Sequence, residues 1–219
     1  MLNILYEDNH IIVVEKPVGI LSQADITKDQ DMLGLIKQYL KEKYQKPGNV
    51  FLGLVHRLDR MVGGIMVFAR TSKAASRLSE QIRTHVFEKN YLAVVHGKTP
   101  QVKQLINYLH KDTNQNFVTV VSEDQGKYAE LSYETIGYQN NLSLIKINLK
   151  TGRPHQIRVQ LSHSGYPLFG DKRYGKEIDQ GNIALFAYSL SFIHPTTKEK
   201  LSFQLVPKTK PFNNFVINL

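Results

Sequence analysis

The sequence predicts an α+β fold built on a largely antiparallel sheet, and three observations predict it. Short β-prone segments follow one another with turn residues between them, as in hairpins. Stretches with the three-to-four-residue spacing of an amphipathic helix are few and scattered among these strands. The 219 residues suffice for one domain with a substantial core, and no repeat or linker divides them.

The alternation of apolar and polar residues predicts seven strands, at residues 4–6, 11–15, 91–95, 131–136, 142–149, 183–192 and 201–206. Pro17 and Gly19 end the second of them, because proline cannot continue a hydrogen-bonded ladder. Gln139, Asn140 and Asn141 join the pair at 131–149 as a hairpin turn. Residues 98–127 are polar and interrupted, and we expect hairpins and loops there.

Two helices are predicted in the first half of the chain. Residues 31–44 place Leu33, Ile36 and Leu40 on one face and lysines on the other. Thr71 and Ser72 then cap a second helix, whose apolar face carries Leu78, Ile82 and Val86.

A third helix is expected from Pro154, which suits the first helical position, to Gly165, which ends it. Leu161 faces one side, and Arg158 lies on the other side with His155. The free N–H groups and dipole of a helix N-terminus that carries Arg153 and His155 favour a phosphate or a carboxylate. A surface helix with solvated arginines is the alternative.

The composition is that of a folded soluble protein, with 42% hydrophobic and 21% charged residues. The formal net charge of +9 indicates a polyanionic partner, nucleic acid first and a membrane surface second, although a merely soluble basic protein would also have it. The absence of cysteine excludes disulfides, thiolate nucleophiles and thiolate zinc sites.

Targeting signals are not evident. Glu7 and Asp8 lie where a signal peptide would carry lysines, and no apolar run approaches the roughly 18 residues that span a bilayer. We therefore expect a cytoplasmic protein with no membrane partner.

The stretch around Asp59 is the strongest candidate for a chemical site. This carboxylate stands between Arg57 and Arg60, which hold it ionised. Gly63 and Gly64 follow, and they let another backbone or a ligand come close.

Other sites are rejected. None of the eight histidines shows the i, i+4 spacing of a helical zinc site, so we expect no metal. Residues 170–176 have the glycine and lysine spacing of a nucleotide-binding loop. Glu177, however, occupies the Ser/Thr position that would hold magnesium, so we interpret this segment as a basic turn near RNA.

With these residues in place, the sequence resembles the RluA branch of the RNA pseudouridine synthases. The resemblance extends, in order and spacing, over almost the whole chain. Its motifs lie at residues 11–21, 56–59, 89–97, 151–159, 165–171, 183–188 and 192–195. One departure is that Val62 and Gly63 stand where the family usually has Thr and Ser, which removes two hydroxyls beside the site.

The resemblance implies a pseudouridine synthase fold with a central catalytic cleft, and the isomerisation of uridine to pseudouridine in ribosomal or transfer RNA. The N1–C1′ bond breaks, the uracil turns, and C5 bonds to C1′, without cofactor or metal. We expect one catalytic domain over residues 1–219 that acts as a monomer. The chain begins at the first strand of that domain, so a separate N-terminal RNA-binding domain is not expected.

The resemblance also assigns roles. Asp59 is the catalytic carboxylate, which either attacks the sugar or removes a sugar proton. Arg158 pairs with Asp59 and keeps it ionised and aimed. Tyr91 stacks on the target uracil and could take its C5 proton, whereas the plain alternative is a core aromatic residue.

The target uracil must be flipped out of its stack. Arg57 is expected to fill the vacated space or to hold a phosphate, and Leu185 to pack against the flipped base. The remaining substrate-binding candidates are His56, Lys16, Arg153, His155 and Lys172.

Two functions of other classes compete with this one. A non-catalytic RNA-binding or ribosome-assembly protein could retain the fold, although the intact Asp59, Tyr91 and Arg158 argue against it. A metal-dependent nuclease built on Asp59 and Asp171 is more distant.

Overall fold

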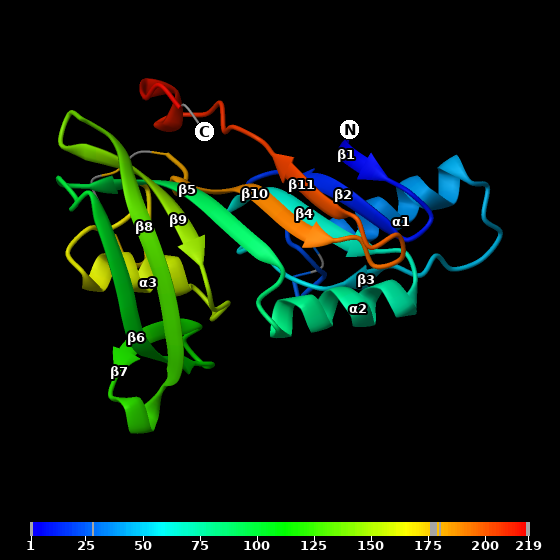
Figure 1. The fold of residues 1–219 in the computed structure, drawn as a ribbon, viewed down its shortest axis with the longest axis horizontal. Helices are drawn as coiled ribbons and strands as arrows, with labels where there is room; N and C mark the ends of the chain where they lie inside the picture. The colour runs from blue at the N-terminus through cyan, green and yellow to red at the C-terminus, as the bar shows by residue number, and fades with distance from the viewer. Residues whose placement is uncertain (1, 28, 176–178, 180, 218–219) are drawn as a thin grey trace. The chain divides into compact units, whose positions relative to one another are not determined.

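The computed structural model describes residues 2–27, 29–175, 179 and 181–217. The chain forms two compact units, the first comprising Met1–Glu88 and Ser189–Leu205, the second comprising Lys89–Tyr188 and Val206–Leu219. The pairings β1–β2, β2–β4, β3–β4, β10–β11, β5–β9, β9–β8, β8–β6 and β6–β7 are all antiparallel. The predicted α+β class with a largely antiparallel sheet is therefore confirmed (Figure 1).

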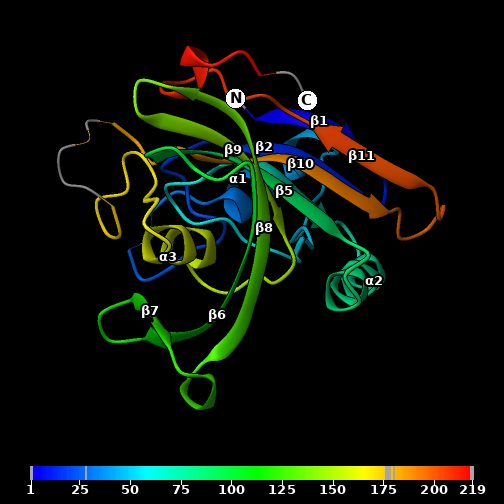
Figure 2. The same ribbon diagram turned by 60° about the vertical axis from the view of Figure 1, so that its left-hand side comes forward.

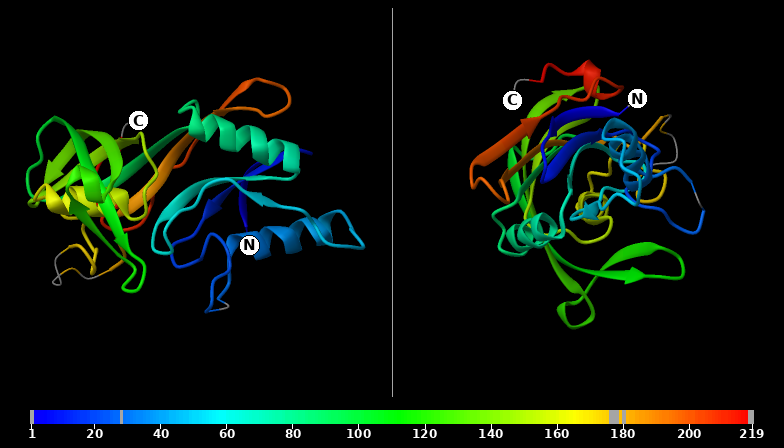
Figure 3. Two further views of the ribbon diagram at one scale, coloured as in Figure 1. Left: turned by 90° about the horizontal axis from the view of Figure 1, so that it is seen from below. Right: turned by 90° about the vertical axis from the view of Figure 1, so that its right-hand side faces the viewer.

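The first unit is a sheet with a helix on each side. Its strands are β1 (Asn3–Glu7), β2 (Ile11–Lys16), β3 (Gly53–Leu54), β4 (Gly63–Ala69), the second half of β10 (Leu185–Ile193) and β11 (Lys200–Gln204). The order is β1-β2-β4-β10-β11, with β3 also beside β4. Helices α1 (Met32–Lys43) and α2 (Ser72–Arg83) lie on opposite sides of these strands (Figure 3).

Helix α2 and the sheet enclose a hydrophobic core of this unit. Ala74 and Leu78 pack with Ile11, Val13 and Val67, which alternate along β2 and β4. All seven residues of β4 are buried, because the sheet is covered on both faces. The strand that leaves the Asp59 stretch is thus firmly anchored.

The second unit is a curved sheet with one helix against it (Figure 2). Its strands are β5 (Glu88–His96), β6 (Val102–Asp112), β7 (Phe117–Val121), β8 (Lys127–Gln139) and β9 (Leu142–Leu149), in the order β5-β9-β8-β6-β7. Helix α3 (Gln156–His163) packs Val159 against Leu109, Val118 and Ala129. Short 3₁₀ turns, η1 (Glu123–Gln125) and η2 (Phe212–Asn214), complete the fold.

Two helix boundaries differ from the prediction. Helix α3 begins at Gln156 rather than at Pro154, because His155 has a left-handed backbone with φ of 50° and cannot be helical. Helix α2 ends at Arg83, where His85 has φ of 59°, so Val86 lies outside it and is 46% exposed.

The seven predicted strands are close to their expected places, whereas β3 and β4 had not been predicted as strands. Residues 98–127, which were hard to interpret, contain the hairpin of β6 and β7. The rejected nucleotide loop at 170–177 ends on Lys176 and Glu177, which lie outside the described residues. None of the helices in the described part of the chain is long and apolar enough to cross a membrane.

Candidate active site

Asp59 lies in the loop that connects β3 to β4, at intermediate exposure. Buried Ser22 fixes Leu58, the residue before Asp59. The Ser22 hydroxyl donates to the carbonyl of Leu58 at 2.8 Å and accepts the N–H of Leu58 at 3.1 Å. The Asp59 carbonyl accepts the N–H of Val62 at 3.0 Å, which closes a turn. The carboxylate is therefore presented from a loop whose backbone is tied down on both sides.

Lys16, at the end of β2, lies beneath this loop. Its side chain is completely buried, and its ammonium donates to the carbonyls of Pro17 at 2.9 Å and Arg60 at 3.1 Å. Burial lowers the pKa of Lys16 from 10.5 to about 8, although the nearby negative charge of Asp59 opposes this shift. This position corrects the prediction that Lys16 contacts the RNA backbone, because its ammonium faces the loop carbonyls and the charge of Asp59.

His56 and Arg57 occupy different environments in the same loop. His56 Nε2 accepts the N–H of Val67 at 3.2 Å, and its ring lies 5.4 Å from that of Phe87. The bond to Val67 attaches the loop to β4, so His56 has an anchoring role. Arg57 is exposed.

Arg158 forms a bidentate ion pair in the second unit. Its Nε and Nη2 donate to the two carboxylate oxygens of Asp171, at 2.9 and 2.8 Å. Burial by itself raises the pKa of Asp171, but the Arg158 guanidinium and two backbone N–H groups hold it below its ordinary value. Both oxygens of Asp171 are thus engaged, which argues against the nuclease interpretation that made it a metal ligand.

Tyr174 connects this ion pair to its surroundings. Its ring centroid lies 5.1 Å from the guanidinium carbon of Arg158, and its hydroxyl lies 2.8 Å from His155 Nδ1. The same hydroxyl accepts the N–H of Val118 in β7 at 2.9 Å. His155, which precedes α3, and Arg158 within it therefore both contact Tyr174, although His155 does not belong to the helix as predicted.

The other predicted site residues of the second unit vary in exposure. Tyr91 in β5 is 6% exposed and pairs with Ile147, which in turn pairs with Tyr133, so the three share one face of the sheet. Leu185 is buried at the start of β10. Arg153 and Lys172 are exposed.

Lys89 is a candidate that sequence reasoning missed. It lies two residues before Tyr91 on the same face of β5, and its ammonium comes close to Gly152. Burial lowers its pKa, and no carboxylate among the described residues forms an ion pair with it. The signal available in the sequence was only this two-residue offset from Tyr91.

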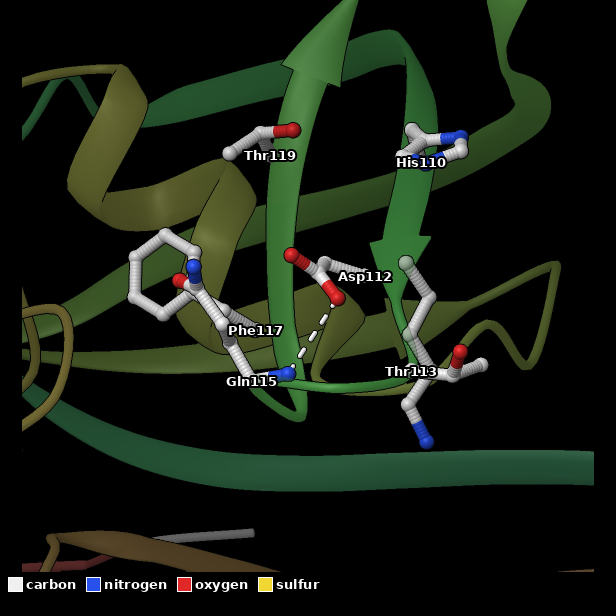
Figure 4. Close-up of a pocket in the computed structure, with 7 residues that line it drawn as sticks. His110, Asp112, Thr113, Gln115, Phe117 and Thr119 are labelled. Carbon is white, nitrogen blue, oxygen red and sulfur yellow. Dashed lines mark hydrogen bonds between the residues drawn. The ribbon is translucent and has the colours of Figure 1, made fainter.

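A shallow pocket at the end of the β6–β7 hairpin contains none of the predicted site residues (Figure 4). Polar side chains dominate its lining, which includes His110, Asp112 and Gln115. The Asp112 carboxylate points into the turn and accepts the N–H groups of Asn114 at 2.8 Å and Gln115 at 3.2 Å. Its carboxylate therefore organises the hairpin turn.

Comparison with solved structures defines the class of fold. The structure titled human RNA pseudouridylate synthase domain containing 4 superimposes with a TM-score of 0.76, covering 93% of this chain and 87% of that one at 20% identity. Human RNA pseudouridylate synthase domain containing 1 gives a TM-score of 0.75, covering 96% and 85% at 20% identity. The predicted pseudouridine synthase fold is thereby confirmed.

Sequence comparison defines the family. The model of the RNA pseudouridylate synthase family matches residues 10–163. Ribosomal large subunit pseudouridine synthase C of Buchnera aphidicola (subspecies Schizaphis graminum) is 35% identical, over 99% of this chain and 70% of its own length. Ribosomal large subunit pseudouridine synthase D of Zymomonas mobilis is 32% identical, over 92% and 68%.

The chain belongs to the RNA pseudouridylate synthase family, and the resemblance to its RluA branch is confirmed. It is accordingly an RNA-modifying isomerase of the pseudouridine synthase class, as predicted. The family match includes Asp59, Tyr91 and Arg158.

Proposed function

We propose that this protein converts uridine to pseudouridine in large-subunit ribosomal RNA, with Asp59 as the catalytic carboxylate. The names of its relatives support the target, since both are called large-subunit enzymes. The observation that carries the catalytic proposal is the Asp59 loop, in which Ser22 and Lys16 fix the backbone while the carboxylate keeps intermediate exposure. A carboxylate so placed can meet a flipped nucleotide.

The proposed reaction is balanced without any redox step. The N1–C1′ bond breaks, C5 bonds to C1′, C5 loses a proton, and N1 gains one. Asp59 either attacks C1′ or removes the C2′ proton, Tyr91 stacks on the uracil, and Arg158 pairs with Asp59. No cofactor or metal enters this scheme.

The proposal places Arg57 and Leu185 at the flipped nucleotide and assigns phosphate contacts to Arg153, His155 and Lys172. Arg57, Arg153 and Lys172 are exposed, which supports their proposed contacts. The enzyme would act as a monomer in the cytoplasm. Transfer RNA is the second candidate target, since the chemistry of the site is the same for both RNAs.

Replacing Asp59 tests the catalytic proposal. We expect Asp59→Asn to abolish tritium release from [5-³H]uridine-labelled transcripts of large-subunit ribosomal RNA, because an amide can neither attack C1′ nor remove a proton. RNA affinity, measured by filter binding, should change little. Asp25→Asn, in an exposed turn, is the matched control and should retain full activity. Turnover by Asp59→Asn close to that of the wild type would refute the assignment.

A second experiment tests the target. Pseudouridines are mapped in ribosomal and transfer RNA from cells that lack the protein, with and without complementation by the wild type. Loss of a large-subunit site that wild type restores and Asp59→Asn does not restore would support the proposal. Loss confined to transfer RNA would replace the target, and no loss at all would favour a non-catalytic RNA-binding role.

A further inference from the structure

The position of Arg158 depends on Asp171. A long arginine side chain has many rotamers, and a catalytic partner has to be held in one of them. Asp171 grips the guanidinium along its Nε–Nη2 edge, which fixes the plane of the group as well as its distance.

Asp171 is itself immobilised. Its side chain is completely buried, and its Oδ1 accepts the N–H groups of Arg173 at 3.0 Å and Tyr174 at 3.2 Å. The turn is tied back to α3, because the Ser162 hydroxyl donates to the Tyr174 carbonyl at 2.5 Å. The guanidinium of Arg158 is therefore bound by a carboxylate whose position is fixed by its own hydrogen bonds.

We propose that Asp171 is a positioning residue for catalysis, which orients Arg158 through the bidentate ion pair without touching the substrate. This inference rests on the proposed role of Arg158 in the reaction. It predicts that loss of the Asp171 charge lowers the rate of the chemical step while the RNA still binds.

Asp171→Asn is the sharpest test, because the amide oxygen can still accept the two backbone N–H groups of the turn. The amide nitrogen then faces a donor of Arg158, so the bidentate pair is lost. In single-turnover tritium release at saturating enzyme we expect a rate about 10²-fold lower, as for a misplaced catalytic group. The affinity for the same large-subunit transcript should be unchanged.

Asp112→Asn is the matched control. Asp112 caps a turn with the same geometry, accepting N–H groups two and three residues ahead, and no ion pair with an arginine involves it in the described part of the chain. Its rate should stay within about twofold of the wild type. Equal rates for Asp171→Asn and Asp112→Asn would overturn the proposal.

Chemical rescue separates positioning from general stability. Added guanidinium should restore activity to Arg158→Ala, because the Asp171 carboxylate can still bind the added ion. It should not restore activity to the double variant Arg158→Ala with Asp171→Asn. Rescue of both to the same extent would contradict a positioning role. If Asp171→Asn does not fold, Arg158→Lys replaces it, because lysine keeps the charge and loses the fork; full activity of that variant would overturn the proposal.

Failure of the proposed function gives a different result. If Arg158→Ala alone is fully active, Arg158 has no part in the reaction and the proposed pairing with Asp59 falls. If Arg158→Ala is inactive while Asp171→Asn turns over at the wild-type rate, the pairing stands and only the positioning role of Asp171 is wrong.

Discussion

At the scale of single residues, the charges around Asp59 illustrate how a motif combines chemistry with structure. Lys16 and Asp59 both fall in motifs that suggested contacts with the RNA. In the structure their exposures differ, since Lys16 is completely buried and Asp59 is partly exposed. Sequence alone shows that a lysine ends a strand; it does not show that two loop carbonyls enclose its ammonium.

Lys16 predicts a specific dependence of stability on pH. Its pKa falls from 10.5 to about 8 on folding because it is buried. Between these values the unfolded chain binds more protons than the folded chain, so the contribution of Lys16 to the free energy of unfolding rises as the pH is raised from about 8 to 10.5. Below pH 8 the lysine is protonated in both states and this contribution is constant.

The measurement is urea unfolding of the wild type and Lys16→Met at several pH values from 7.5 upwards. We expect the difference in unfolding free energy between the two proteins to shift in favour of the wild type across the window. Other groups that titrate in this range are common to both proteins and cancel. Parallel curves would mean that Lys16 does not titrate in this range.

At the scale of elements, the sequence predicted well wherever local chemistry decides the structure. Asp31 and Thr71 cap α1 and α2 with their side chains, as residues of these types do at helix starts. Asn140 and Asn141 form the turn between β8 and β9 with φ of 50° and 58°. These positions need no information from distant parts of the chain.

Prediction failed where tertiary contacts override the local pattern. Pro154 predicts a helix start, but the backbone of His155 is left-handed and the helix begins one residue later. The His155 ring contacts the hydroxyl of Tyr174, which lies nineteen residues further along the chain. Strand β6 is exposed at many positions, so its 11 residues lack a clear alternation. The Arg158–Asp171 pair was missed for a similar reason, because it joins a helix to a segment that was interpreted only as a basic turn near RNA.

The β8–β9 turn gives a prediction at this scale. Asn141→Ala should lower the free energy of unfolding by about 1 kcal/mol, because a Cβ-bearing residue without a polar side chain is disfavoured at left-handed φ. This corresponds to a decrease in Tm of about 2–4 °C. Asn141→Gly is the matched control and should be neutral or stabilising. A melting temperature for Asn141→Ala equal to that of the wild type would contradict the turn assignment.

At the scale of the whole molecule, the two compact units divide the proposed catalytic residues. Asp59 belongs to the first unit, and Tyr91 and Arg158 belong to the second. Each unit fixes its own share locally, by the Lys16 and Ser22 contacts in one and the Asp171 ion pair in the other. Family membership was predictable because the motifs in both units keep their order and spacing along the chain.

The net charge of +9 gives the last prediction, which concerns RNA binding. Lysine and arginine contacts with phosphates release counterions, so the logarithm of the association constant should fall steeply and linearly with the logarithm of the KCl concentration. The slope is measured by filter binding of a large-subunit ribosomal RNA transcript at about 50 to 200 mM KCl, a range over which such slopes are resolved. A flat response would show that lysine and arginine contacts with phosphates do not drive RNA binding.

Single substitutions then locate the contacts. Arg57 is exposed and no ion pair with a described carboxylate involves it, so Arg57→Ala should reduce the slope by about 1, as loss of one phosphate contact does. Arg83 is the matched control, because Glu80 already neutralises it through an ion pair on α2. Arg83→Ala should leave the slope unchanged. Since the slope counts phosphate contacts and not catalytic events, equal slopes for Arg57→Ala and the wild type would remove Arg57 from the phosphate-binding surface while leaving the assignment of Asp59 intact.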